Sequence, residues 1–340
     1  MSTAPVTGEQ EHPPIPSAKR GPRPIVGLLL AMCALFAADL LLFHMPVYSY
    51  IIEPDSSTGW VETTIHNEHV QQAQHHNLVL TMGDSRFAIA QRIINEEVTP
   101  PTGYIFRAGA IPGSSPRIWY YMLRDMDPDR QAYRAIVFGL DDYDDEDPGW
   151  DWADDARSIH YLAARLRLMD AIEFAGSYRS WPLRWEAFRD VLFRGLIYQD
   201  DLRALLRHPG NRLHDAIETR DHSEDLYYVW SGLERDMKGF AADWDTLKVT
   251  SYPPWADEKL REDINNFLLH PVYPQTGHPG EYRRRWLGKM IDRYRNTATK
   301  IIFIRLPRGP VVRPGNPVID RKSTRLNSSH IQKSRMPSSA

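Results

Sequence analysis

Hydrophobic residues form one long run near the N-terminus of this chain and several short runs further along. The long run covers residues 25–43 and is interrupted by a single charged residue, Asp39. Nineteen residues of α-helix are long enough to cross a bilayer. We therefore predict a transmembrane anchor over residues 25–44, with Asp39 near its outer end and its carboxylate extending to the membrane surface.

The distribution of charge around this run predicts its orientation. Lys19, Arg20 and Arg23 precede it, and the next Lys or Arg is Arg86. The positive-inside rule therefore places residues 1–24 in the cytoplasm. These residues are rich in proline and polar residues and are predicted to form a disordered tail. The chain is then a single-pass cell-membrane protein whose remainder is extracytoplasmic, and periplasmic in a Gram-negative bacterium. A cleaved signal peptide is the alternative, but the length of the run favours an uncleaved anchor.

Four short apolar runs have the composition of buried parallel strands: 78–82, 104–106, 135–140 and 300–305. Segments whose apolar residues have helical spacing separate the first three of these runs. About 160 residues, mostly with helix-compatible spacing, separate the third from the fourth. We predict an α/β fold of three layers (α/β/α) around a parallel sheet, over residues 77–320, with a large helical insertion at about 145–298.

Residues 45–76 are predicted to be a juxtamembrane segment. It contains His66, His69, His75 and His76, a spacing that raises the question of a metal site. Neighbouring glutamines favour a solvated polar helix instead, so no metal or cofactor is predicted here. An acidic stretch that begins at the end of the third strand lacks the EF-hand spacing and is interpreted as a solvated loop.

Composition narrows the function. The formal net charge of −3 gives no reason to expect nucleic acid as a partner, and the single cysteine excludes an internal disulfide. Residues 321–340 contain five basic residues, no acids and no apolar periodicity, and are predicted to be a non-native tail. Without them the charge falls to −8, and the natural C-terminus is expected to be missing. Aromatic residues of the insertion, including Trp181 and Trp185, suit the core, sugar stacking or a membrane interface.

Three loops that follow the first three strands contain candidate chemistry. Gly83-Asp84-Ser85 ends the first strand and begins a helical pattern, which places a serine hydroxyl near helix-terminal amides. A helix cap is the alternative role of this turn. The second loop contains Gly113, and the third is Gly139-Leu140-Asp141-Asp142. The carboxyl ends of parallel strands meet at one sheet edge, so these loops could surround one reacting carbonyl.

In these three blocks the chain resembles the SGNH (GDSL-like) hydrolase superfamily, specifically a membrane-anchored extracytoplasmic branch related to polysaccharide O-acetyltransferases and esterases. The resemblance covers residues 75–145 and 301–306. It implies Ser85 as the nucleophile, an oxyanion-stabilising amide at Gly113, and Asp141 and Asp142 at the Gly-x-Asn-Asp positions. Arg86 is expected to contact an anionic substrate or to pair with an acid. The implied partners are a cell-envelope glycan or acyl-bearing small molecule, the membrane through residues 25–44, and a membrane acyl-transfer protein.

Two departures from the family pattern affect the expected activity. Asp141 replaces an asparagine whose amide donates to the oxyanion, and an ionised carboxylate cannot donate. The family's Asp-x-x-His is absent before residue 321, where Asn327 to His330 is a coincidental match. A serine needs a base, so this chain is expected to be truncated and inactive, unless a histidine of the insertion substitutes. Those histidines are His160, His208, His214, His222, His270 and His278. The alternative function is a non-catalytic scaffold of an envelope-polysaccharide assembly.

Overall fold

The computed structural model describes residues 24–88, 94, 102–141, 154–221, 238–243, 246, 248–265 and 278–306. It is a mixed α/β structure whose described helices are α1 (Pro24–Phe43), α2 (Pro46–Tyr50), α3 (Ser57–Gln74), α6 (Pro116–Met126), α7 (Arg157–Leu162), α8 (Ala171–Ala175), α9 (Trp181–Leu192), α10 (Gln199–Arg207), α11 (Pro209–Asp221), α12 (Glu258–Asp263) and α13 (His278–Tyr294), with the 3₁₀ turns η3 (Leu168–Asp170) and η4 (Arg194–Leu196). The strands are β1 (Leu78–Met82), β2 (Ile105–Ala108), β3 (Ala135–Asp141), β4 (Ala241–Asp243), β5 (Lys248–Ser251) and β6 (Lys300–Leu306).

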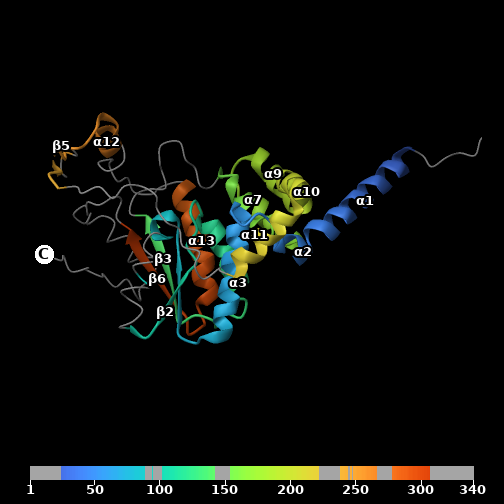
Figure 1. Ribbon diagram of the computed structural model, residues 1–340, viewed down its shortest axis with the longest axis horizontal. Helices are drawn as coiled ribbons and strands as arrows, with labels where there is room; N and C mark the ends of the chain where they lie inside the picture. The colour runs from blue at the N-terminus through green and yellow to red at the C-terminus, as the bar shows by residue number, and fades with distance from the viewer. Residues whose placement is uncertain are drawn as a thin grey trace, which may run out of the picture.

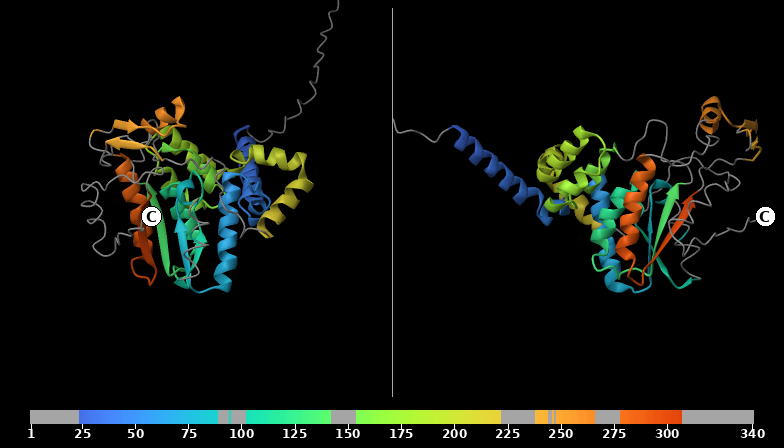
Figure 2. Two further views of the ribbon diagram at one scale, coloured as in Figure 1. Left: turned by 60° about the vertical axis from the view of Figure 1, so that its left-hand side comes forward. Right: turned by 180° about the vertical axis from the view of Figure 1, so that it is seen from behind.

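The central sheet has the order β2-β1-β3-β6, and all of its strands are parallel. Every residue of β1 is buried, which explains its uninterrupted apolar sequence. Figures 1 and 2 show α3, α6 and α13 together on one face of the sheet. The predicted parallel α/β sheet is therefore confirmed, and the four predicted strand positions agree with the observed ones to within two residues at each end.

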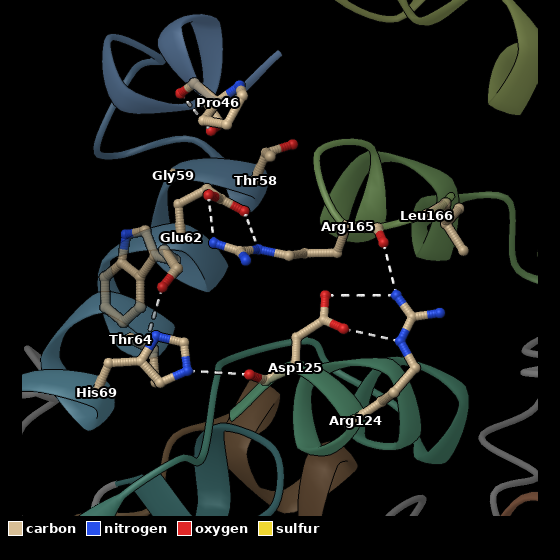
Figure 3. A network of polar contacts seen from close by, with 12 residues as sticks. Pro46, Thr58, Gly59, Glu62, Thr64, His69, Arg124, Asp125, Arg165 and Leu166 are labelled. Atoms are coloured by element: carbon tan, nitrogen blue, oxygen red, sulfur yellow. Dashed lines mark hydrogen bonds and ion pairs between the residues drawn. The ribbon is translucent and has the colours of Figure 1, made fainter. Parts of the chain in front are cut away.

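The helix α3 corrects the expectation of a solvated polar helix within residues 45–76. Glu62 is 4% exposed, and its carboxylate accepts two 2.5 Å hydrogen bonds from the guanidinium of Arg165 (Figure 3). Glu68 is 1% exposed and accepts a 3.0 Å hydrogen bond from Nε of Arg107. Charged side chains are rarely buried unless they are paired. The glutamates Glu62 and Glu68 therefore face partners inside the protein, where the sequence alone suggested water, whereas His69 and Gln74 of the same helix are exposed.

The insertion is built largely of short helices, as predicted, but it also contains a strand pair. The strands β4 and β5 form an antiparallel hairpin with an irregular register. Figure 1 places α9, α10 and α11 beside the C-terminal end of α1, whereas β5 and α12 lie at the opposite end of the molecule. The helices α9, α10 and α11 of the insertion thus lie near α1, apart from its β4–β5 hairpin and α12.

The helix α1 is long and apolar enough to span a membrane, since residues 25–43 have a mean hydropathy of 2.5. Asp39 does not extend to a membrane surface as expected. It is 7% exposed, and its carboxylate accepts backbone hydrogen bonds from Arg194 (3.1 Å) and Gly195 (2.7 Å) at η4. These amides belong to the first turn of η4 and need an acceptor. The acid in the apolar run therefore joins the helix to the insertion.

Candidate functional site

The strand order identifies one edge of the sheet as the place for a ligand. From β1 the chain passes to β2 on one side, and β3 then pairs with β1 on the other side. In open α/β sheets, such a switch point leaves a crevice outside the carboxyl ends of the two diverging strands. The residues directly after β1 and at the end of β3 therefore occupy the favoured position for a site.

The turn after β1 is a short elbow that leads into a helix. Residues 85–88 are helical, and the carbonyl of Asp84 accepts hydrogen bonds from the amides of Phe87 (3.1 Å) and Ala88 (3.0 Å). One carboxylate oxygen of Asp84 accepts a 2.9 Å hydrogen bond from the Arg86 amide, so Asp84 caps the helix. Ser85 is the first helical residue and is half-buried. The cap and the candidate nucleophile are thus neighbouring residues, and the two roles do not exclude each other.

The loop after β2 is fastened to this elbow. The carbonyl of Gly83 accepts hydrogen bonds from the Ile111 amide (3.0 Å) and the Ser114 hydroxyl (2.9 Å). The Ser114 amide in turn donates to the Ile111 carbonyl at 3.1 Å, which closes a tight turn. Gly113 occupies this turn with φ of +70°, a backbone conformation that favours glycine. The structure therefore brings the Ser85 elbow and the Gly113 turn together, as the sequence predicted.

Tyr161 of α7 also belongs to this region, and the sequence analysis did not identify it. Its hydroxyl donates a 2.7 Å hydrogen bond to the Pro112 carbonyl, and a Cβ added at Gly113 would lie 2.7 Å from that hydroxyl. Burial raises the pKa of Tyr161, so the hydroxyl keeps the proton that it donates. The contact joins residues 49 positions apart in sequence, and no sequence motif around Tyr161 predicts it.

The third block reaches the same edge through packing. An added Cβ at Gly139 would lie 2.6 Å from the ring of Phe87, so glycine lets the helix after Ser85 rest directly on β3. Asp141 ends β3, where its backbone is in register with Leu306 of β6. Asp142 and the acidic stretch that follows lie outside the described residues. The backbone of Asp141 is thus placed at the predicted edge.

Arg86 pairs with Asp84, its neighbour in the elbow. Its Nε lies 3.2 Å and 3.0 Å from the two carboxylate oxygens, and its Nη2 also contacts the carboxylate. Of the two roles expected for Arg86, pairing with an acid is therefore observed, and the described acid is Asp84. Pairing with the acidic stretch after β3 involves residues outside the described part of the chain. The contact with a substrate stays a prediction.

The described residues do not supply a base at Ser85. The Ser85 hydroxyl makes no hydrogen bond to the described part of the chain. His160, His208 and His214 are exposed on the insertion, and His214 Nε2 lies 3.4 Å from a carboxylate oxygen of Glu218. His278 begins α13. His222, His270 and the stretch from Asn327 to His330 fall outside the described residues.

The histidines of residues 45–76 do not gather into a metal site. His69 Nε2 lies 3.0 Å from the Asp125 carbonyl oxygen, as Figure 3 shows. Burial lowers the pKa of His66. No group of three or more His, Cys, Asp or Glu side chains suited to a metal ion occurs among the residues that the structure describes.

Comparisons with known proteins add no assignment, since no family model, curated protein or solved structure matches this chain.

Proposed function

We propose that this chain is a membrane-anchored serine acyl esterase or O-acetyltransferase of the SGNH type, with Ser85 as its nucleophile. The anchor is α1, with a cytoplasmic N-terminus, and the three-layer SGNH-like domain lies outside the membrane. The substrate class is an acylated glycan or another acyl-bearing molecule of the cell envelope. The observation that carries the proposal is the place of Ser85: the first residue of a helix, directly after β1, at the switch point of a parallel sheet.

The proposed reaction uses the elbow and the Gly113 turn together. Ser85 Oγ forms a bond to the acyl carbonyl carbon, its proton passes to a base, and the carbonyl oxygen becomes an oxyanion. Backbone amides of Ser85 and Gly113 would stabilise that charge. The oxyanion collapses, the bond from the acyl carbon to the alcohol oxygen breaks, and the base returns its proton to the leaving alcohol. Water or a sugar hydroxyl then attacks the acyl carbon, and its proton passes through the base to Ser85 Oγ as the bond to Ser85 breaks. The hydrogen bonds from Ile111 and Ser114 to Gly83 support this account, because they hold the two segments together.

The test replaces the unassigned base with one in solution. Imidazole accepts the serine proton, p-nitrophenyl acetate supplies the acetyl group, and p-nitrophenolate leaves. Peptide mass spectrometry is expected to find acetyl on Ser85, and the Ser85→Ala variant should lose this modification. Ser180 is a matched control, because it is also half-buried, directly precedes a helix, α9, and makes no side-chain capping hydrogen bond. Ser180→Ala should leave the acetylation of Ser85 unchanged.

The alternative is a non-catalytic scaffold of an envelope-polysaccharide assembly. Asp141 favours it, because a carboxylate at the position of a donating asparagine opposes a developing oxyanion. Equal labelling of Ser85 and Ser180, or no labelling of a chain that circular dichroism shows to be folded, would overturn the enzyme proposal in favour of the scaffold.

A further inference from the structure

Large apolar side chains are unusually exposed in one part of the insertion. Outside α1 and α2, the described large apolar residues that are at least 60% exposed all lie between residues 168 and 206. They are Met169 (81%), Ile172 (80%), Trp181 (74%), Leu206 (72%) and Trp185 (60%). Single exposed apolar residues are ordinary, but several in one region mark an interaction surface.

The same part of the insertion is attached to α1. Asp39 accepts the amides of Arg194 and Gly195, and the rings of Phe36 and Phe193 meet edge to face with centroids 5.4 Å apart. These contacts follow directly after α9, which ends at Leu192. Figure 1 shows α9 and α10 beside the C-terminal end of α1. If the C-terminal end of α1 emerges from a bilayer, these contacts hold α9 close to the lipid headgroups.

The exposed side chains are spaced to form faces. Met169 and Ile172 are three residues apart, Trp181 and Trp185 are four apart, and α8 packs against α9. Tryptophan is enriched at membrane interfaces, where its ring is buried and its N–H stays hydrated. Arg179, which is exposed, lies between the two pairs in sequence and suits anionic headgroups.

We infer that α8 and α9, with η3, form a membrane-contacting surface that lies on the same bilayer leaflet from which α1 emerges. The occupant is phospholipid: the side chains of Met169, Ile172, Trp181 and Trp185 enter the boundary between headgroups and acyl chains. The insertion is then held at the membrane by α1 and by this surface together. The inference rests on the proposed membrane span of α1 and goes beyond it by assigning a second contact.

The test uses the full chain reconstituted in vesicles of phosphatidylcholine and phosphatidylglycerol, with a fluorophore attached to single cysteines. Cys33 lies in α1 and is the natural reporter of the span. In a Cys33→Ser background, Ile172→Cys and Trp185→Cys report the proposed surface. Trp255→Cys is the matched control, because Trp255 is also an exposed tryptophan (39%) and lies between β5 and α12. Quenching is measured with nitroxide-labelled lipids.

We expect loss of fluorescence at Cys33 with nitroxide on the acyl chain, loss at Ile172→Cys and Trp185→Cys with nitroxide near the headgroup, and no loss at Trp255→Cys. Quenching at Cys33 without quenching at the two surface reporters would leave the anchor intact and overturn the inference, assigning the surface to a glycan or protein. Equal quenching at Trp255→Cys would also overturn it. An unquenched Cys33 would remove the membrane span and the inference with it.

Discussion

At the carboxyl edge of the sheet, the segments that follow the first three strands are joined by backbone hydrogen bonds and by close packing. Gly83 accepts the Ile111 amide, and Gly139 leaves room for the ring of Phe87. In the helical layer between the sheet and α1, segments distant in sequence are joined by charged side chains. Glu62 pairs with the Arg165 guanidinium across 103 residues, and the Asp39 carboxylate accepts the backbone amide of Arg194 across 155. The first region depends on side-chain size and turn geometry, the second on buried carboxylates and their distant donors.

The largest effect is expected when one charge is removed from the helical layer, which tests the role of buried charge there. Arg165→Met leaves the Glu62 carboxylate buried without its partner, and such a loss typically costs about 3–5 kcal/mol. We expect that decrease in the free energy of unfolding, measured with urea and circular dichroism in detergent micelles. The double variant Glu62→Gln, Arg165→Met should recover part of it, because no buried charge remains. A loss below about 1 kcal/mol in the single variant would contradict the assignment of this pair.

The sheet edge should respond instead to added volume. Gly139→Ala places a methyl group against the ring of Phe87, and overpacking of this kind costs about 1–3 kcal/mol. The same unfolding measurement should show a smaller loss when Gly139→Ala is made in a Phe87→Leu background. Equal losses in both backgrounds would show that Phe87 does not limit the space at Gly139.

The junction between α1 and η4 should respond locally. Asp39→Asn replaces one accepting oxygen with a donor, while hydrogen bonds to charged groups contribute about 1.5–3 kcal/mol. We expect hydrogen exchange of the Arg194 and Gly195 amides to rise by about tenfold, which corresponds to about 1.4 kcal/mol. The Gly109 amide, which donates to the Thr81 carbonyl at the sheet edge, should keep its exchange rate. Faster exchange at all three amides would indicate global destabilisation instead.

The smallest effect is expected from an ion pair on the surface of the same helical layer. Asp200 and Arg203 are paired at 2.8 Å, but their side chains are 93% and 65% exposed. Asp200→Asn should change the free energy of unfolding by less than about 0.5 kcal/mol. A larger effect would mean that charge pairing stabilises this layer regardless of burial, and the contrast with the sheet edge would rest on charge alone.

The same contrast explains what could be predicted from the sequence. Buried parallel strands need continuous apolar runs, so β1 and β6 could be predicted from the sequence. Gly113 could be assigned to a turn because glycine readily adopts the positive φ found there. The burial of α3 could not be predicted, because glutamates and glutamines are typical of a solvated helix and their buried partners are distant in sequence. The hairpin of β4 and β5 was missed because strands of three and four residues show too little alternation.

The contact between Asp39 and η4 also imposes an order on synthesis. Asp39 is synthesised 155 residues before the backbone amide of Arg194. At about 5–20 residues per second, roughly 8–30 s pass before the backbone amides that donate to this carboxylate are made. During that interval the Asp39 carboxylate, near the C-terminal end of the apolar helix, lacks its hydrogen-bond donors from η4. The junction between α1 and η4 can therefore form only after this part of the insertion has been made.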